Sequence, residues 1–274
     1  MTNQSNLNLN LADDEIYYGL EANKVYMGVS QYKRFKDCEA RALAEVNGEW
    51  VRNTDSPALI LGNYVHSYFE SEETHNLFIE NNKDKIFSKR KPFGLLKAYE
   101  QADVMIKKLS EEQLFNYLWQ GERETVVTGE LYGVEWKGKI DLLNVDKGYF
   151  VDLKTTAGIS NRFYNEKYGK YVSFVEHYGY VLQIAVYEKL LTQLYGKPFT
   201  GYIYAISKQD IPEMVAIEIE QHKKEFELNL LSEEIARVVS VKNGEEEPTA
   251  CGKCDFCKTT QKLEGFITTD NLIG

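Results

Sequence analysis

The stretch GKIDLLNVDKGYFVDLKTT, residues 138–156, holds two short apolar runs that each carry one aspartate. Asp141 lies in KIDLLNV, and Asp152 lies in YFVDLKTT with Lys154 two positions further on. The DKG segment between the runs is a turn signal between strands. Burying unpaired charge among aliphatic side chains is costly. The stretch therefore predicts a β-hairpin, and it raises the question of what compensates its buried charges.

Hairpin geometry can bring these three charged groups into one pocket. Adjacent strands lie about 4.8 Å apart, and residues two apart on one strand leave the same face. Two aspartates with a backbone oxygen suit a hard dication such as Mg²⁺ or Mn²⁺, which also meets substrate phosphates. A lysine beside the metal can orient or help deprotonate an attacking water. The plainer alternative is a surface Asp–Lys pair at a strand end, because Asp-x-Lys alone is common.

Composition is that of a globular protein. The chain has 274 residues, of which 43% are hydrophobic and 27% charged, and this suits one large domain over residues 1–274. No apolar run approaches the roughly 20 residues that span a bilayer. The polar start MTNQSNLNLNLADDE lacks the features of a signal peptide. We therefore expect no membrane association and a location in the cytoplasm of a bacterial host cell.

The net charge of −10 by itself argues against non-specific binding to nucleic acid, because phosphate contacts need Lys and Arg. The distribution of charge matters more than its sum, however. Residues 83–97, KDKIFSKRKPFGLLK, are strongly basic and include Lys89, Arg90 and Lys91. This segment is a candidate for binding the DNA backbone, although a solvated surface is the simpler explanation for such a run.

Periodicity and turn signals divide the chain into helices and strands. Ser30 is a predicted N-cap, and Ser56 with Pro57 marks the start of a second helix. The predicted helices are 30–47, 55–73, 94–119 with a second short helix, 173–195 and 221–241. The predicted strands are 124–133, 134–145, 148–155, 199–207 and 213–220, with a loop at 157–171. The fold class is α/β, an α+β mixed sheet flanked by helices, with a helical part at 24–120, an α/β core at 121–220, and a C-terminal helix with a cysteine clip at 221–274.

The order of motifs resembles that of a known nuclease superfamily. The pattern D-x10-D-x-K on a hairpin is followed by a helix that carries Gln183 and Tyr187 as Gln-x-x-x-Tyr. This arrangement resembles the PD-(D/E)XK nucleases, and more narrowly their RecB-like branch. The segment LGNYVHSYFE, residues 61–70, is similar to the N-terminal helix motif of that branch and aligns its histidine with His66. The surrounding sequence looks closest to phage RecE-like exonucleases, which implies a restriction-endonuclease-like core and a single-strand annealing protein as partner.

The resemblance implies a role for each matching residue. Asp141 and Asp152 would be metal ligands together with the backbone oxygen of Leu153, and Lys154 would be the catalytic lysine. His66 would be a further metal ligand, and Gly62, one turn earlier on the same helix face, would leave space for it. Gln183 and Tyr187 would hold the DNA strand or a water near the metal. Glu130 would be a weaker candidate for an indirect contact with the metal. Taken alone, the histidine suits a core position, and the glutamine and tyrosine suit ordinary helix packing.

Four cysteines form the second candidate site. Cys251, Cys254 and Cys257 lie together in CGKCDFC, and Cys38 is far away in the sequence. Nothing in the sequence indicates secretion, so a metal site is favoured over disulfides. Four thiolates are the ligand count of a [4Fe–4S] cluster or of a structural Zn²⁺ site.

One cysteine before the core and three after it resemble the iron–sulfur nucleases of the AddB and CRISPR-adaptation types. That resemblance favours [4Fe–4S], in a role that staples the chain ends. The last gap here is two residues, whereas those families usually have a longer one, so Zn²⁺ remains the alternative. Cysteines without metal are the third possibility.

Three functions are compatible with these features. The leading hypothesis is a metal-dependent DNA exonuclease of phage-type recombination or DNA processing, which hydrolyses phosphodiester bonds from DNA ends. The alternatives are a single-strand-specific exonuclease of the iron–sulfur CRISPR-adaptation type and a DNA-binding module without catalysis. Resemblance to RecE-like enzymes also suggests a homo-oligomer.

Overall fold

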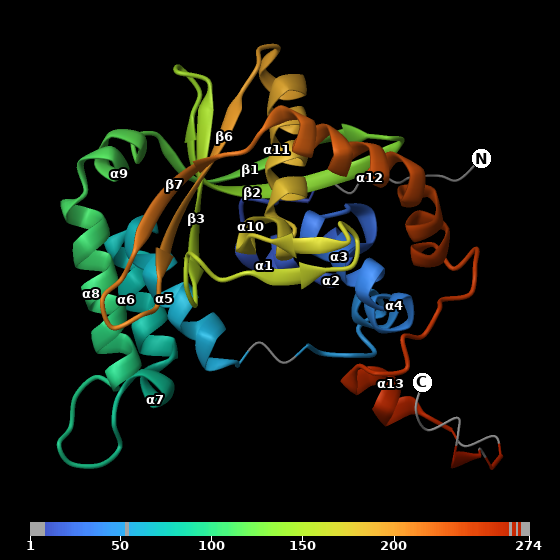
Figure 1. The fold of residues 1–274 in the computed structure, drawn as a ribbon, viewed down its shortest axis with the longest axis horizontal. Helices are drawn as coiled ribbons and strands as arrows, with labels where there is room; N and C mark the ends of the chain where they lie inside the picture. Colours follow the sequence, from blue (N-terminus) through green and yellow to red (C-terminus); the bar gives the residue numbers. More distant parts are fainter. Residues whose placement is uncertain (1–8, 53–54, 263–264, 267, 270–274) are drawn as a thin grey trace.

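A five-stranded mixed sheet forms the centre of the computed structural model, which describes residues 9–52, 55–262, 265–266 and 268–269. The strand order is β1-β2-β3-β6-β7. Pairing is antiparallel except between β3 and β6, which are parallel. The strands are β1 (Glu122–Leu131), β2 (Val134–Asn144), β3 (Tyr149–Thr156), β6 (Thr200–Ser207) and β7 (Met214–Glu218). Figure 1 shows helices on both sides of this sheet, so the predicted α/β class is confirmed.

Two hydrophobic cores lie on opposite faces of the sheet. One joins the sheet to α3 (Val29–Asp37), α4 (Glu39–Asn47), α11 (Tyr180–Tyr195) and α12 (Gln221–Lys242). The other joins it to α5 (Pro57–Glu70), α8 (Lys97–Glu111) and α9 (Gln113–Leu118). The remaining helices are α1 (Asp14–Tyr18), α2 (Leu20–Val25), α6 (Glu72–Asn81), α7 (Lys83–Ile86), α10 (Phe174–His177) and α13 (Asp255–Thr260).

The central strand β3 contributes to both cores. Phe150 packs into the core of α11 and α12, whereas Val151 and Leu153 pack into the core of α5 and α8. Successive side chains of a strand point to opposite faces, so this alternation buries β3 on both sides. Its apolar sequence up to Asp152 is typical of such a strand.

The predicted starts and turns are confirmed where local chemistry sets them. The side chain of Ser56 accepts a hydrogen bond from the backbone N–H of Leu59, and Pro57 is the first residue of α5. The hairpin of β2 and β3 pairs Asn144 with Tyr149 around the predicted turn. Helix α12 also matches the helix predicted at 221–241.

Two predicted long helices are interrupted. The helix predicted at 30–47 breaks at Cys38, whose extended backbone separates α3 from α4, and the N-cap is Gly28 rather than Ser30. The helix predicted at 173–195 breaks at Gly179, whose φ of +67° is a left-handed conformation that favours glycine. Both predictions of one continuous helix were wrong, because hydrophobic periodicity does not reveal a single residue whose backbone leaves the helical conformation.

The predicted loop at 157–171 contains a small antiparallel hairpin. Its strands are β4 (Phe163–Asn165) and β5 (Lys170–Val172), which form a two-stranded sheet of their own. The loop prediction was therefore wrong for these residues. Three-residue strands are too short to show alternation in the sequence.

Gly201 on β6 tests how closely helix α11 approaches the sheet. A Cβ at this position would lie closer than 3.0 Å to Phe150 and Ile184. We expect Gly201→Ala to lower the free energy of unfolding by about 1–3 kcal/mol, since overpacking strains a filled core. Thermal unfolding measures this loss. Gly265→Ala is the matched control, because its added methyl meets nothing within 4 Å, and equal stability of the two variants would contradict the packing described here.

Candidate active site

Asp141 and Asp152 approach each other across β2 and β3. Leu142 pairs with Val151, and continuing that antiparallel register by one residue sets Asp141 opposite Asp152. The Oδ2 atom of Asp141 accepts a hydrogen bond of 2.7 Å from the backbone N–H of Leu153. The carboxylate of Asp141 therefore reaches across to β3, next to Asp152.

Asp152 is the buried centre of the site, with 3% of the residue exposed. Its Oδ1 accepts a hydrogen bond of 2.8 Å from the side chain of Gln183 on α11. Its Oδ2 lies 2.6 Å from Nζ of Lys154, although among the described residues it has no partner with hydrogen-bond geometry. The structure thus brings Asp152, Lys154 and Gln183 together from β3 and α11.

Lys154 lies between this carboxylate and an aromatic ring. Its Nζ is 4.8 Å from the ring centroid of Tyr180, the first residue of α11. Burial alone lowers the pKa of Lys154, but the charges of Asp152 and Asp141 outweigh burial and raise that pKa above its usual value. The lysine is therefore protonated at neutral pH.

His66 on α5 approaches the site from the opposite face of the sheet. Its Nδ1 is 3.6 Å from Oδ2 of Asp141, which is longer than a hydrogen bond. Burial, and next the nearby charge of Lys154, lower the pKa of His66 to about 4. The neutral imidazole is the form that ligates metals, so the state of His66 suits a ligand.

Burial, and next the charge of Asp152, raise the pKa of Asp141 to about 7. Two buried carboxylates this close repel each other when both are ionised. A bound cation would relieve that repulsion. Carboxylate oxygens, a backbone carbonyl and a neutral imidazole form a donor set that fits a hard dication.

The spacing of this donor set is looser than that of a closed metal site. In the part of the chain that the structure describes, the one group of three or more His, Cys, Asp or Glu residues with all ligand atoms within 4.8 Å is formed by the cysteines. An ion such as Mg²⁺ usually keeps several waters and few protein ligands. The looser spacing is therefore compatible with such an ion.

Tyr187 and Glu130 have places other than those expected. Tyr187 is buried, and a Cβ on Gly138 would lie 2.5 Å from its ring, so the ring packs against the backbone of β2. The backbone carbonyl of Glu130 accepts a hydrogen bond from Gln193, and Glu130 pairs with Glu135 near the far end of β1. The structure does not bring Glu130 to Asp141.

Glu124 is the acidic residue of β1 that lies close to Asp141. The pairings of β1 with β2 begin with Leu131 opposite Val134, and counting seven residues back along β1 and seven forward along β2 sets Glu124 opposite Asp141. Burial, and next the charge of Asp141, raise the pKa of Glu124 to about 7. The sequence contained this signal in the Tyr132-Gly133 turn, which fixes the register.

The basic residues predicted to bind DNA are exposed. Lys89, Arg90 and Lys91 lie in the loop between α7 and α8, which Figure 1 shows beyond the lower end of the helices. Lys33 of α3 donates a 2.8 Å hydrogen bond to the carbonyl of Tyr178. Burial, and next the charge of Lys154, lower the pKa of Lys33 to about 8, so Lys33 lies near Lys154.

A cavity of about 1220 Å³ opens beside this part of the molecule. Its wall includes Lys33, Arg52, Lys167, Tyr178 and Tyr180. Since Tyr180 also contacts Lys154, the cavity leads up to the catalytic residues.

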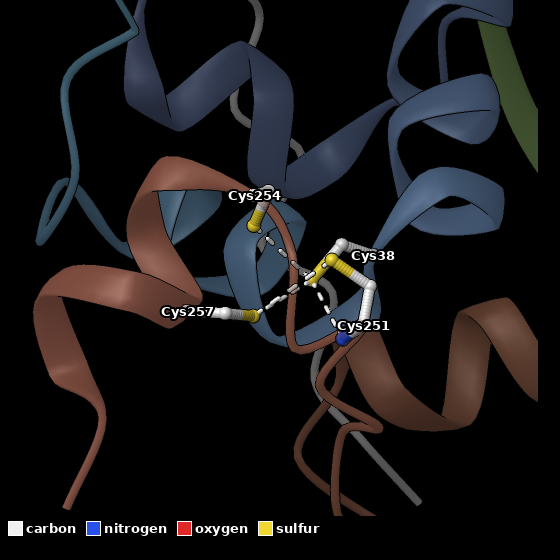
Figure 2. Close-up of side chains that lie close together, drawn as sticks. All are labelled: Cys38, Cys251, Cys254 and Cys257. Carbon is white, nitrogen blue, oxygen red and sulfur yellow. Dashed lines mark hydrogen bonds between the residues drawn. The ribbon is translucent and has the colours of Figure 1, made fainter. Parts of the chain in front are cut away.

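The four cysteines come together at the chain ends, as Figure 2 shows. The Sγ atom of Cys38 lies 3.6 Å from that of Cys257 and 3.8 Å from that of Cys254. The Sγ atoms of Cys251 and Cys257 are 3.9 Å apart. Sulfurs bound tetrahedrally at about 2.3 Å from one Zn²⁺ lie roughly 3.8 Å apart.

This sulfur spacing favours one ion over a cluster. A [4Fe–4S] unit places four irons between its cysteines, so its sulfurs stand further apart than around a single ion. Backbone N–H groups of Lys253 and Cys254 lower the pKa of Cys251 to about 6, which favours the thiolate that binds metal. The geometry thus fits the alternative of Zn²⁺ better than the favoured [4Fe–4S].

Comparison with known proteins identifies a matching family and a similar solved structure. The family described as "PDDEXK-like domain of unknown function (DUF3799)" matches residues 28–260. The chain is similar to the crystal structure of a "Putative exonuclease" from Eubacterium rectale, with 33% identity, a TM-score of 0.87, and coverage of 95% of this chain and 97% of the other.

Two further comparisons do not bear on the family or the function of this chain. A solved structure named SSO0001 aligns over 80% of this chain and 91% of its own at 13% identity, with a TM-score of 0.28. No curated protein matches the sequence significantly. Within the described residues, the helices are too short or too polar for any of them to cross a membrane.

We predict that replacing Asp141 and replacing Asp152 by asparagine change the free energy of unfolding in opposite directions when a chelator is present. The raised pKa of Asp141 means that the folded state loses stability as the pH rises from about 4 to about 7. Asp141→Asn removes that loss and keeps an acceptor for Leu153, so we expect a gain on the order of 1–2 kcal/mol at pH 8.5 and a smaller gain at pH 5.5. Asp152→Asn leaves Lys154 buried without its counter-ion and should cost about 3 kcal/mol.

Thermal unfolding in EDTA between pH 5.5 and 8.5 measures both effects. If the two variants respond alike, or if Asp141→Asn destabilises more as the pH rises, then the charge distribution derived for this site is incorrect.

Proposed function

This chain belongs to the PDDEXK-like family DUF3799, and on that premise we propose that it is a metal-dependent deoxyribonuclease, an exonuclease that hydrolyses phosphodiester bonds from DNA ends. The observation that carries the proposal is the buried Asp152, bound by Lys154 and Gln183 beside Asp141. Lys154 balances only one of these two buried carboxylates, and a bound dication would offset the charge of the other. The name of the similar E. rectale protein as an exonuclease supports the choice of reaction.

The proposed metal-holding residues are those nearest the junction of β2 and β3. Asp141 and Asp152, with the backbone oxygen of Leu153, would hold Mg²⁺ or Mn²⁺, and His66 would be a further ligand. A bound dication would neutralise charge on the scissile phosphate and lower the pKa of the attacking water. Gln183 fixes the orientation of Asp152 through its hydrogen bond, so its role is to position that carboxylate.

Lys154 supplies positive charge to the reaction. Because the neighbouring carboxylates keep it protonated, it acts as a donor that orients the attacking water and stabilises negative charge on the phosphate. The ring of Tyr187 packs against the backbone of β2 at Gly138, so we assign it the role of supporting that strand. Glu124 lies close enough to modulate the charge of Asp141.

Two other functions rest on weaker support. A single-strand-specific exonuclease would use the same residues on a different substrate, and the cavity beside Lys33 favours it to some extent. A DNA-binding module without catalysis is the weaker hypothesis, because all six motif residues are present: His66, Asp141, Asp152, Lys154, Gln183 and Tyr187. The proposed setting remains phage-type recombination in a bacterial cytoplasm, with an annealing protein as partner and self-association.

Digestion of end-labelled DNA tests the proposed reaction. We expect the protein to degrade linear DNA in Mg²⁺ or Mn²⁺ and to leave closed circular DNA intact. Asp152→Ala and Lys154→Ala should each reduce the rate by at least about 10³-fold, because each removes charge that stabilises the transition state. Labels at the 5′ and 3′ ends report the polarity in the same assay, and duplex and single-stranded substrates report the strand preference.

Lys147→Ala is the matched control for loss of a lysine, since Lys147 lies in the exposed turn between β2 and β3. Should wild type digest neither duplex nor single strands with either metal, the proposed activity would be refuted. Cleavage of closed circles would show an endonuclease instead.

The cysteine site is proposed to hold one tetrahedral Zn²⁺ in a structural role, on the strength of its sulfur spacing. We expect protein purified without oxygen to be colourless and to contain about one zinc per chain. Cys257→Ser should abolish the bound zinc and lower the unfolding temperature, because the site ties α4 to α13. A brown protein that absorbs near 400 nm and contains iron would establish the [4Fe–4S] alternative.

A further inference from the structure

The β4–β5 hairpin has one buried and one exposed face. Phe163 pairs with Val172, and Tyr164 pairs with Tyr171, so each pair shares a face. Val172 is buried, whereas Tyr164 and Tyr171 are 58% and 69% exposed. The two tyrosine rings contact each other edge to face, with centroids 5.6 Å apart. The hairpin therefore presents a pair of aromatic rings to solvent.

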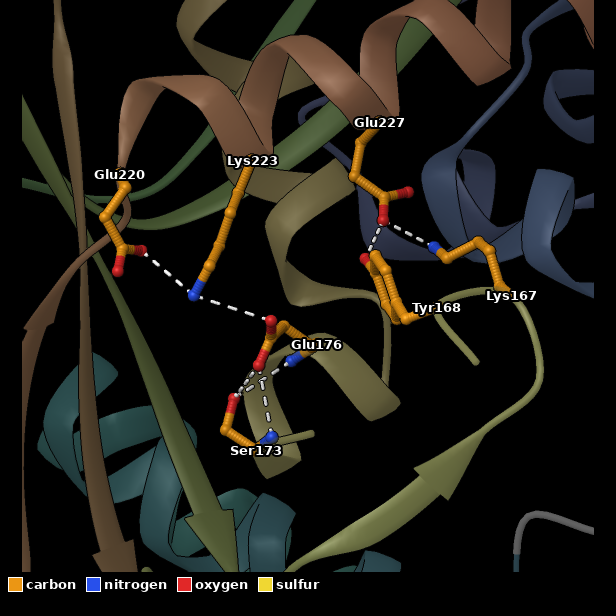
Figure 3. Close-up of polar contacts among 7 residues, drawn as sticks. All are labelled: Lys167, Tyr168, Ser173, Glu176, Glu220, Lys223 and Glu227. Carbon is orange, nitrogen blue, oxygen red and sulfur yellow. Dashed lines mark hydrogen bonds and ion pairs between the residues drawn. The ribbon is translucent and has the colours of Figure 1, made fainter. Parts of the chain in front are cut away.

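The tip of the hairpin is fastened to helix α12. Glu227 is almost fully buried, forms an ion pair with Lys167 and accepts a hydrogen bond from the hydroxyl of Tyr168, as Figure 3 shows. At the base, the ring of Phe163 stacks on that of His177 with centroids 4.4 Å apart. An isolated two-stranded hairpin is only marginally stable in water, so these contacts hold the exposed tyrosines in place.

The segment that follows the hairpin is fastened in the same way. Ser173 and Glu176 form a capping box at the start of α10, and Lys223 of α12 bridges Glu176 and Glu220 (Figure 3). The hairpin and α10 are thus attached to one helix at several points. A rigid aromatic surface loses little conformational entropy when it binds a ligand.

Aromatic contacts connect the hairpin to the catalytic lysine. The ring of Phe163 lies 5.5 Å from that of Tyr178, which is 45% exposed, and Tyr178 lies 5.9 Å from Tyr180. Tyr180 in turn contacts Nζ of Lys154 at 4.8 Å. This chain of contacts places the buried face of the hairpin beside α10 and the start of α11, and the exposed tyrosines lie on the opposite face of the same hairpin.

Positive charge accompanies this surface although the whole chain is acidic. Arg162 and Lys170 flank the hairpin strands and are exposed, and within the described residues neither forms an ion pair. Lys33 lies on the neighbouring wall, bound to the carbonyl of Tyr178. The adjacent cavity of about 1220 Å³ has both basic and acidic residues on its wall.

We infer that the exposed aromatic pair of Tyr164 and Tyr171 binds single-stranded DNA by stacking with its bases. This inference rests on the proposed nuclease function and specifies the form of its substrate. Stacking needs bases whose faces are free, as they are in a single strand, and it tolerates any sequence. Arg162 and Lys170 contact the backbone of the same strand.

Binding of a fluorescent single-stranded 20-mer in EDTA tests this surface without cleavage. We expect the double variant Tyr164→Ala/Tyr171→Ala to bind about 10- to 100-fold more weakly than wild type, since two stacking rings are lost. The double variant Tyr164→Phe/Tyr171→Phe should bind like wild type, because phenylalanine keeps the ring. Tyr117→Ala is the matched control: Tyr117 is 57% exposed but lies on α9.

The inference is overturned if wild type does not bind the single strand, or if the double alanine variant binds it fully at an unchanged unfolding temperature. It is also overturned if Tyr117→Ala weakens single-strand binding as much as the double alanine variant does. The same holds if the double alanine variant loses as much affinity for blunt duplex as for the single strand. If DNA digestion fails while tyrosine-dependent binding persists, the nuclease proposal fails and the binding surface stands. If DNA digestion proceeds but single-strand binding does not depend on the tyrosines, the nuclease proposal stands and the proposed binding surface fails.

Discussion

The ion pair between Asp152 and Lys154, enclosed in the central strand, is the constraint on which the rest of the structure depends. β3 is buried on both faces, so its charged residues cannot rely on water for stabilisation. Lys154 and Gln183 compensate Asp152, and Leu153 donates to Asp141. Each of these contacts requires β2, β3 and α11 to keep their positions, so the fold and the proposed chemistry share one set of interactions.

Contacts between segments that are far apart in the sequence hold the helices around the central sheet. Cys38 precedes the sheet and the other three cysteines follow it, with Cys38 and Cys251 separated by 213 positions. A cross-link over such a loop restricts the unfolded chain and stabilises the folded one by roughly 5 kcal/mol in the loop-entropy estimate. Helix α12 adds a second tie, since Glu227 holds the β4–β5 hairpin and Arg237 pairs with Glu39 of α4. These ties hold α3 and Lys33 beside the active site.

Sequence reasoning succeeded where the signal is local and failed where it is not. The hairpin of β2 and β3 follows from period-two alternation and a turn, and α5 follows from Ser56 and Pro57. Cys38 leaves the helical conformation to bring its thiol to the other cysteines, a contact that no local pattern records. Glu130 was predicted and Glu124 was missed, because the sequence of the strand does not by itself give its register against β2.

The sequence by itself determined the mixed α/β class, the order of the strands along the chain and the spacing of the two aspartates and the lysine, because these depend on short-range periodicity and turn chemistry. Only the tertiary structure decided which side chains meet. It set Gln183 on Asp152, Lys33 beside Tyr180, the cysteine sulfurs at single-ion spacing, and the tyrosines of β4 and β5 on an open face. Such meetings join residues from separate elements, and their distances follow from how those elements pack rather than from any pattern along the chain.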